Sequence, residues 1–310
     1  VTTMKLANRL AAVKPSPTLS LNAKARALAA SGKDVLSFAA GEPDFDTPAH
    51  VKDAIKAALD AGFTKYTATG GIPELKTAIG DKLAKENAFS VSPEQIVVTT
   101  GGKQALYNAF QALLSPGDEV VIFAPFWVSY PDMVRLADGV PVIVETKSEN
   151  NWTPDPAALR KALSPRTKAV IFNSPSNPTG SVIAKEALAA LAHELRDTDA
   201  VLITDDIYER LLYVPGPFVN VANAAPEFAA RTLVVNGFSK AFSMTGLRLS
   251  YAAGPKDLIA GMQMIQDQST SNATSIIQKG AVAALKGPTA PIEEMVKAFA
   301  RRRVSITEGL

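Results

Sequence analysis

The sequence predicts an α/β protein whose main unit is a three-layer αβα domain built on a mainly parallel sheet. Short runs rich in β-branched residues are expected to be strands, and amphipathic helical patterns lie between most of them. Strands that are apolar along their whole length and alternate with helices are typical of a parallel sheet covered on both faces. The expected strands span residues 95–99, 119–123, 140–145, 169–172, 201–204, 232–236 and 249–253.

The helical patterns divide the chain into three expected parts. Helices are predicted at 103–114, 155–163 and 185–195 between the strands, and at about 19–30 before them. We expect residues 1–48, which include an apolar run at 35–38, to form an arm and the first part of a small α+β domain. Residues 49–288 would form the large domain, and 289–310 a connecting helix. The apolar stripe of that helix comprises Ile292, Met295, Val296, Phe299, Ile306 and Leu310.

Composition excludes several classes of function. The 310 residues carry a net charge of +2, so there is no electrostatic case for a nucleic-acid partner. The longest basic run, 301–303, is expected to be a solvated helix face. No cysteine is present, and the two histidines, His50 and His193, are expected on helix surfaces, so we predict no metal site. No apolar run is long enough to span a membrane and the N-terminus lacks a signal-peptide core, so the cytoplasm is the expected location.

Polar residues follow the expected strands in an order that indicates one site. Asn177, Asp205, Tyr208, Lys240 and Arg248 each lie at a strand end or in the turn after it. Ligands of such sheets bind at the carboxyl ends of the strands, so these side chains are expected to meet there. An amide, a carboxylate, a phenol, an amine and a guanidinium are the groups that a pyridoxal-phosphate site requires.

Each of these residues has a proposed role and a simpler alternative. Lys240 would form an imine with the cofactor aldehyde and then act as a general base, unless it is a surface lysine. Asp205 would keep the ring nitrogen protonated, or only cap the turn that follows it. Tyr208 and Asn177 would donate to the phenolate oxygen of the ring, although Asn177 precedes a proline and is also a turn residue. Trp127 would stack on the ring, or be part of the core.

The expected phosphate site is a glycine turn that opens a helix. Gly101, Gly102 and Lys103 follow the first strand, where backbone amides and the helix dipole favour an anion. A strand-to-helix turn often needs glycine in any case. Ser239 would add a hydroxyl, or cap its own turn, and Arg248 is placed to neutralise the phosphate.

Together these motifs resemble a known family. Through segments 14–18, 41–48, 65–75, 101–106, 173–180, 205–208 and 235–248, the chain is similar to the fold-type I pyridoxal-phosphate enzymes of the class I aminotransferases. It is closest in pattern to the bacterial aspartate and aspartate/prephenate subgroup. The resemblance covers essentially the whole chain.

The resemblance implies further roles and a partner. Gly41 would offer a backbone amide to the substrate α-carboxylate, where Trp127 and Asn177 also contribute. Lys103, Ser16 and Thr18 would line the pocket for the distal carboxylate of the substrate. Tyr66 would reach the phosphate of a neighbouring subunit, which implies a homodimer.

The sequence departs from the family pattern in three places. The pattern Gly-Trp-Arg-x-Gly-Tyr is represented by residues 246–251, with Leu247 and Ser250 at the second and fifth positions, so local packing there is in question. Asp206 stands in place of the usual glutamate. The family continues beyond Leu310 with the arginine that binds the substrate α-carboxylate, so a segment that ends at Leu310 is expected to bind the cofactor without efficient turnover.

The expected activity is transamination between aspartate or glutamate and oxaloacetate or 2-oxoglutarate, with prephenate as a further candidate oxo acid. Alternatives on the same fold are transamination of aromatic or neutral amino acids and a lyase or synthase reaction. A non-catalytic effector domain of a transcription regulator is disfavoured, because only a short arm precedes the domain. A dinucleotide-binding dehydrogenase is disfavoured because no G-x-G-x-x-G follows a strand.

Overall fold

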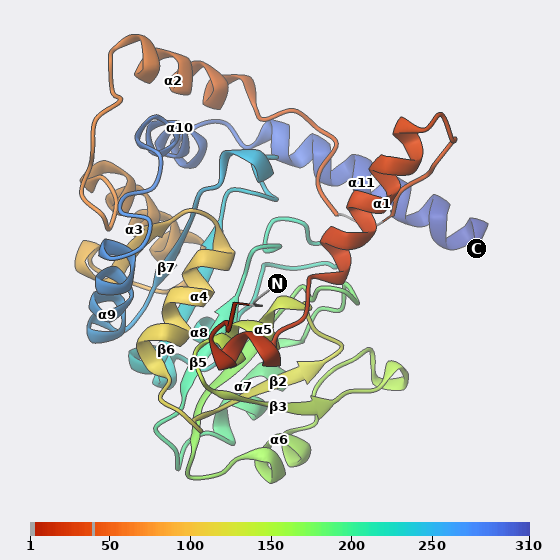
Figure 1. Cartoon of the computed structure of the whole chain (residues 1–310), viewed down its shortest axis with the longest axis vertical. Coiled ribbons are helices and arrows are strands. Elements are labelled where there is room, and N and C mark those ends of the chain that lie inside the picture. Colours follow the sequence, from red (N-terminus) through yellow and green to blue (C-terminus); the bar gives the residue numbers. More distant parts are fainter. Residues whose placement is uncertain (1–3, 39–40) are drawn as a thin grey trace.

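The computed structural model describes residues 4–38 and 41–310 and contains a sheet of seven strands in the order β1-β7-β6-β5-β4-β2-β3 (Figure 1). Each strand predicted from the sequence is present, with ends that differ by two residues at most, and the α/β fold class is confirmed. The strands are β1 (Ile96–Thr99), β2 (Glu119–Ala124), β3 (Val140–Glu145), β4 (Thr167–Asn173), β5 (Val201–Asp205), β6 (Thr232–Gly237) and β7 (Ser250–Ala253).

The helices alternate with the strands over most of the chain. Before the sheet lie α1 (Pro17–Ala30), α2 (Ala49–Asp60) and α3 (Pro73–Asn87). The helices between strands are α4 (Gly102–Leu113), α5 (Ser129–Leu136), α6 (Pro156–Ala162), α7 (Lys185–His193) and α8 (Val221–Ala224). After β7 follow α9 (Lys256–Asp267), α10 (Ser275–Lys286) and α11 (Ala290–Gly309).

One strand runs against the others. β2, β3, β4, β5 and β6 pair in parallel, whereas β7 is antiparallel to both of its neighbours, β6 and β1. The start of β7 therefore lies at the same edge of the sheet as the ends of β1 and β6. In the register, Ser250 of β7 is opposite Thr99 of β1 on one side and Gly237 of β6 on the other.

Both faces of the sheet are buried by helices, which explains why the strands are apolar throughout. One face packs against α4, α5 and α9 through residues such as Val97, Ile122 and Val235. The other face packs against α3, α10 and α11 near β1, β7 and β6, and against α7 near β4 and β5. Because successive residues of a strand point to opposite faces, two neighbouring residues at a strand end contact different sets of helices.

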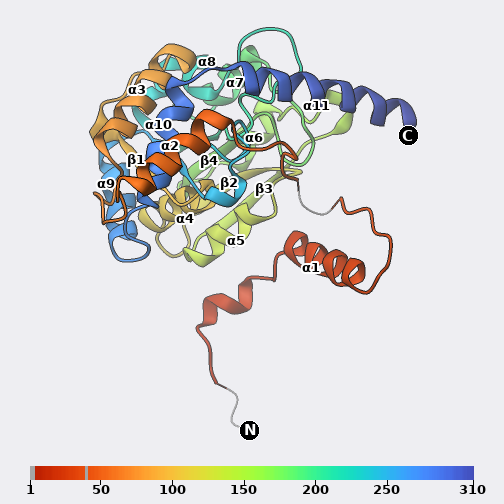
Figure 2. The ribbon, with the colours of Figure 1, turned by 90° about the horizontal axis from the view of Figure 1, so that it is seen from above.

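The two ends of the chain differ from the expectations in detail. The helix at α1 is present but buries no residue, and it lies apart from the body of the molecule (Figure 2). The apolar run 35–38 belongs to no strand. In α11, Ile292 and Met295 are buried as expected, but Ile306 and Leu310 are exposed because the last turns extend beyond the sheet.

His50 also departs from its expected place on a helix surface. Its Nε2 atom is buried, and its ring lies against Gly287 at the end of α10. In the described ranges 4–38 and 41–310, no three histidine, cysteine, aspartate or glutamate side chains are grouped to hold a metal ion. Within the same ranges, no helix is both long and apolar enough to cross a membrane.

Candidate active site

The predicted site residues meet at the edge where the parallel strands end. Asp205 is the last residue of β5, and Lys240 follows β6 by three residues. Gly101 follows β1, Asn177 follows β4, and Arg248 precedes the antiparallel strand β7. Residues far apart in the sequence therefore come together because their strands are neighbours in one sheet.

Asp205 is a buried carboxylate with a strong hydrogen-bond donor. The hydroxyl of Tyr130, on α5, donates to Oδ2 of Asp205 over 2.6 Å, and the amide of Ile207 lies 3.4 Å from Oδ1. Burial nevertheless raises the pKa of Asp205, and the two donors only oppose that rise. A buried carboxylate stays charged most readily when a cation faces it. This environment suits a partner such as a protonated heterocyclic nitrogen.

Tyr208 and Asn177 lie together beside Asp205. The turn of Tyr208 follows β5, and a side-chain hydrogen bond joins Tyr208 to Asn177. Burial and the nearby Asp205 raise the pKa of the phenol, so Tyr208 is neutral at physiological pH. Asn173 fixes this arrangement: its Nδ2 donates to the carbonyl of Asp205 over 2.9 Å, and its Oδ1 accepts from the amide of Asn177 over 2.8 Å.

Lys240 points into the same cluster. Its Nζ atom donates to the carbonyl of Gly41 and lies 5.8 Å from the centroid of the Tyr208 ring. Desolvation lowers the pKa of Lys240, Glu42 opposes this, and Arg248 lowers the pKa further. A lowered pKa increases the fraction of neutral amine, which is the form that acts as a nucleophile or a base.

A glycine turn brings cations next to the first turn of α4. Gly101 has φ of +99°, and a Cβ at this position would lie 2.5 Å from Nη2 of Arg248. Glycine is therefore required both by the backbone and by the approach of the guanidinium. Gln104 holds the turn, because its Oε1 accepts hydrogen bonds from the amide and the hydroxyl of Thr100 over 2.6 and 2.8 Å.

Lys103 faces the site as well as the solvent. Its side chain is exposed in part, yet its Nζ lies 5.0 Å from the centroid of the Trp127 ring. Desolvation and the neighbouring Arg248 both lower the pKa of Lys103. Trp127 in turn packs edge-on against Tyr130, with ring centroids 5.4 Å apart. Lysine, tryptophan and tyrosine thus form one wall next to Asp205.

Some predicted residues lie elsewhere. Tyr66 is 92% exposed, and Ser16 and Thr18 belong to the arm at the start of α1, where Ser16 caps the helix. Gly41 is joined to the cluster through Lys240, and Ser239 is buried beside Lys240 in the sequence. Gly102 begins α4.

Sequence analysis did not assign two residues that shape the site. No role was predicted for Tyr130, since a tyrosine shortly after a strand is usually part of the core. Asn173 is the first residue of segment 173–180, and no role was predicted for it. The spacing of four residues between Asn173 and Asn177 is the local signal that would have suggested their hydrogen bond.

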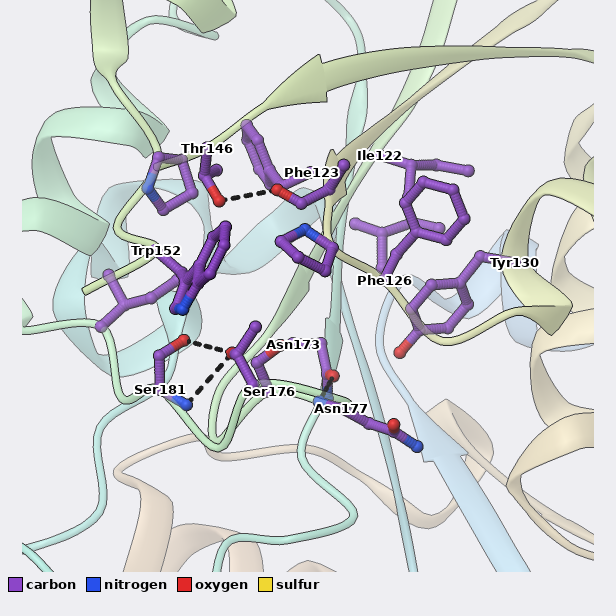
Figure 3. A pocket seen from close by; sticks show the side chains of 16 residues that line it. Ile122, Phe123, Phe126, Tyr130, Thr146, Trp152, Asn173, Ser176, Asn177 and Ser181 are labelled. Carbon is purple, nitrogen blue, oxygen red and sulfur yellow. Dashed lines mark hydrogen bonds between the residues drawn. The ribbon is translucent and has the colours of Figure 1, made fainter. Parts of the chain in front are cut away.

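A small cavity adjoins the cluster without being part of it. Its volume is about 30 Å³, and residues at the ends of β2 and β4 line it together with Asn177 (Figure 3). Tyr130, Asn173 and Asn177 are on one side, and Trp152 and Ser181 are on the other. Since one water needs about 10–15 Å³ by this measure, the cavity has room for about two waters.

Asp206, next to Asp205, points to the opposite face of the sheet and is fully buried. Its carboxylate accepts hydrogen bonds from Thr204 and Asn220, each over 2.5 Å. Burial raises the pKa of Asp206 to about 7; Glu209 adds to the rise, and Lys82 opposes it. Asp206 is therefore a titratable carboxyl group in the core.

This environment predicts how stability depends on pH. The folded protein keeps the Asp206 proton up to about pH 7, whereas the ordinary value of 3.8 applies to the unfolded chain. The contribution of this carboxyl to stability therefore falls as pH rises from about 4 to 7. Asp206→Asn lacks the titrating group, so its stability should not fall over this pH range for this reason. The difference between the Tm of the variant and the Tm of the wild type should therefore increase from pH 5 to pH 8. A Tm difference that does not change with pH would contradict this prediction.

Comparisons with known proteins agree with the geometry. A family model described as aminotransferase class I and II matches residues 33–310. The aspartate/prephenate aminotransferase of Nitrosomonas europaea is 50% identical over 308 residues, covering 99% of this chain and 78% of that protein. The aspartate aminotransferase of Geobacillus stearothermophilus is 48% identical over 299 residues, covering 96% of this chain and 76% of that protein.

A solved structure is similar over almost the whole chain. The aspartate aminotransferase from Thermus thermophilus with maleate superposes with a TM-score of 0.96 and 48% sequence identity. The match covers 99% of this chain and 80% of that one.

Proposed function

The chain belongs to the class I and II aminotransferase family, and from this premise we propose that it is a pyridoxal-phosphate enzyme that exchanges the amino group of aspartate or glutamate with a 2-oxo acid. The observation that carries the proposal is the meeting of Lys240, Asp205, Tyr208 and Asn177 at one edge of the sheet. The named activities of the relatives supply the substrate class. Prephenate is included as an acceptor because the name of the Nitrosomonas europaea relative includes it.

The residues present fit the cofactor. Bound pyridoxal phosphate supplies an aldehyde for an amino group and a ring that draws electrons from the substrate α-carbon. Asp205 offers a buried negative charge to the ring nitrogen, and Tyr130 holds that carboxylate in place. Tyr208 and Asn177 are placed to donate to the ring oxygen, and Trp127 to cover the ring face.

The anionic end of the cofactor fits the glycine turn. Arg248 lies against Gly101, and the first amides of α4 begin at Gly102. A helix N-terminus with an arginine beside it favours phosphate. Lys103 follows Gly102 in α4 and Ser239 precedes Lys240 after β6, and we propose that they contribute a positive charge and a hydroxyl.

Lys240 is the proposed nucleophile and proton carrier. Its lowered pKa gives it neutral amine for attack on an aldehyde and for accepting the α-proton of a substrate. The carbonyl of Gly41 fixes its position. We propose that the amide of Gly41 contributes to binding of the substrate α-carboxylate, near Trp127 and Asn177.

The domain organisation remains a proposal of the same kind. Residues 49–288 would form the cofactor domain, with residues 1–48 and 289–310 contributing the arm and part of a small domain. The exposed side chain of Tyr66 and the arm that buries none of its α1 residues support a homodimer, in which Tyr66 reaches the phosphate of the second subunit. Within that dimer, Ser16 and Thr18 would close over a substrate. The cytoplasm is the proposed location.

An absorbance spectrum tests the activity directly. The protein with pyridoxal phosphate should show the absorbance of the lysine-bound cofactor, and aspartate should shift it to that of the aminated cofactor. Addition of 2-oxoglutarate should then restore the first spectrum and yield glutamate. Release of ammonia or a cleaved side chain, without glutamate, would favour a lyase instead.

Lys103 provides a test of the substrate class. Its ammonium, next to Trp127 and Arg248, is placed to bind a distal carboxylate. Lys103→Ala is therefore expected to raise KM for aspartate and to weaken kcat/KM by about 2–4 kcal/mol, as for loss of one partner of a buried charge pair.

Two comparisons make this test specific. Activity of Lys103→Ala toward alanine or phenylalanine should change far less than activity toward aspartate. Lys103→Met retains the apolar stem against Trp127, so it separates loss of charge from loss of packing. Equal losses for acidic and neutral substrates would mean that Lys103 serves the cofactor or the fold.

A further inference from the structure

Ser250 carries a buried hydroxyl that lacks a partner. The residue begins β7 and is 0% exposed, and its Oγ atom has no hydrogen-bond partner among the described residues. Leaving a buried polar group unpaired destabilises the folded protein, so each such group calls for a physical explanation. Ser250 also stands where the family pattern has glycine, so it is a feature of this chain.

The hydroxyl lies beneath the glycine turn. Ser250 is opposite Gly237 in the register, and a Cβ added to Gly237 would overlap the Ser250 side chain. A Cβ added to Gly102, the first residue of α4, would lie 3.9 Å from Oγ of Ser250. Oγ is therefore enclosed between the end of β6 and the first turn of α4. Only glycine at 237 leaves room for it.

The surroundings of this hydroxyl favour an anion. α4 is a helix of 12 residues whose N-terminal amides face this region. Arg248, two residues before Ser250, places its guanidinium against Gly101. Lys103 and Lys240 both have a pKa that the positive charge of Arg248 lowers, so three cations lie close together. A phosphate would neutralise these charges and accept from a hydroxyl at the same time.

We infer that Ser250 is an additional phosphate-binding residue of this chain, whose hydroxyl donates from the floor of the glycine turn to the phosphate of the cofactor, directly or through one water molecule. The inference rests on the proposed function, because the phosphate is that of pyridoxal phosphate. Ser250 would then bind the phosphate at a position where glycine, which has no side chain, would offer no hydrogen-bond donor.

Stability without a ligand gives the first readout. Ser250→Ala removes an unpaired hydroxyl and should raise the Tm of the cofactor-free protein by about 2–4 °C. Ser275→Ala is the matched control, because the buried Ser275 hydroxyl donates to the carbonyl of Phe63 over 2.8 Å. Loss of that bond should lower the Tm instead.

Phosphate binding gives the second readout: Ser250→Ala should stabilise the cofactor-free protein but weaken its binding of phosphate. In the cofactor-free protein, the Kd of inorganic phosphate and that of pyridoxal phosphate should each rise about 10-fold in Ser250→Ala, as for loss of one hydrogen bond to a charged group. Ser250→Gly should show the same loss. Ser275→Ala should bind both ligands like the wild type. The phosphorus NMR resonance of the bound cofactor should also move in Ser250→Ala.

The two readouts separate the outcomes. A higher Tm together with weaker phosphate binding in Ser250→Ala supports the inference. A lower Tm without ligand, or unchanged affinity for both ligands, overturns it and assigns Ser250 to packing. If the wild type fails to bind pyridoxal phosphate at Lys240, the proposed function fails. If the wild type binds it and Ser250→Ala binds it equally well, only the role of Ser250 fails.

Discussion

Lys240→Ala is expected to lower kcat for transamination by about 10⁴-fold or more, because in the proposed function this one side chain would perform both the nucleophilic and the proton-transfer roles. Its Nζ is held by the carbonyl of Gly41 near the Tyr208 ring. Steady-state rates with aspartate and 2-oxoglutarate measure the loss.

A second variant separates the contribution of the positive charge of Lys240 from that of its nucleophilic amine. Lys240→Arg keeps the positive charge but lacks a primary amine, so it should be as inactive as the alanine variant. Borohydride reduction of the wild type followed by peptide mapping should recover the pyridoxyl mass on the peptide with Lys240. Lys161→Ala, on the exposed face of α6, should retain normal rates. A pyridoxyl group on Lys65 or Lys103 would contradict the assignment.

Asp205→Asn is expected to lower kcat/KM by about 10³-fold while the protein still folds. The amide fits the same space and can accept from Tyr130, but it lacks the charge that would keep a ring nitrogen protonated. The measurement is kcat/KM for aspartate, together with the absorbance of the bound cofactor to confirm that it is present.

Asp206→Asn is the matched control for this prediction. The two carboxyl groups are adjacent in the sequence and both are buried, but Asp206 faces Thr204 and Asn220 on the other side of the sheet. Its replacement should change the pH dependence of stability and leave kcat/KM within a few-fold of the wild type. Similar losses in both variants would show that the turn, and not the charge of Asp205, is responsible.

The strands were predictable because their apolar residues form short runs between turn residues. Their ends were less predictable, since polar residues such as Asn173 and Asp205 extend β4 and β5 through backbone pairing with a neighbour. The place of β7 between β1 and β6 could not be predicted. Strand order depends on pairing between residues far apart in the sequence, and no local pattern records it.

The site was predictable for residues whose type is unusual at a strand end. Lys240 and Asp205 were chosen for this reason, and the structure brings them together. Tyr130 was not chosen, because its hydrogen bond to Asp205 depends on how α5 packs on the sheet, which no local pattern records. The sequence showed Asp206 only in place of the usual glutamate, and the burial that raises its pKa depends on the packing around it.

The antiparallel strand β7 has a consequence for how the protein folds. β7 is the last strand in the sequence, yet it pairs with the first, so Thr99 and Ser250 become neighbours across about half of the chain. Closing so long a loop is slow, because its entropy is lost before the pairing contributes stability. Arg248 reaches Gly101 only through this pairing. We therefore expect a growing chain to form the proposed phosphate site in one of the last steps of folding, after β2 to β6 have had the opportunity to assemble.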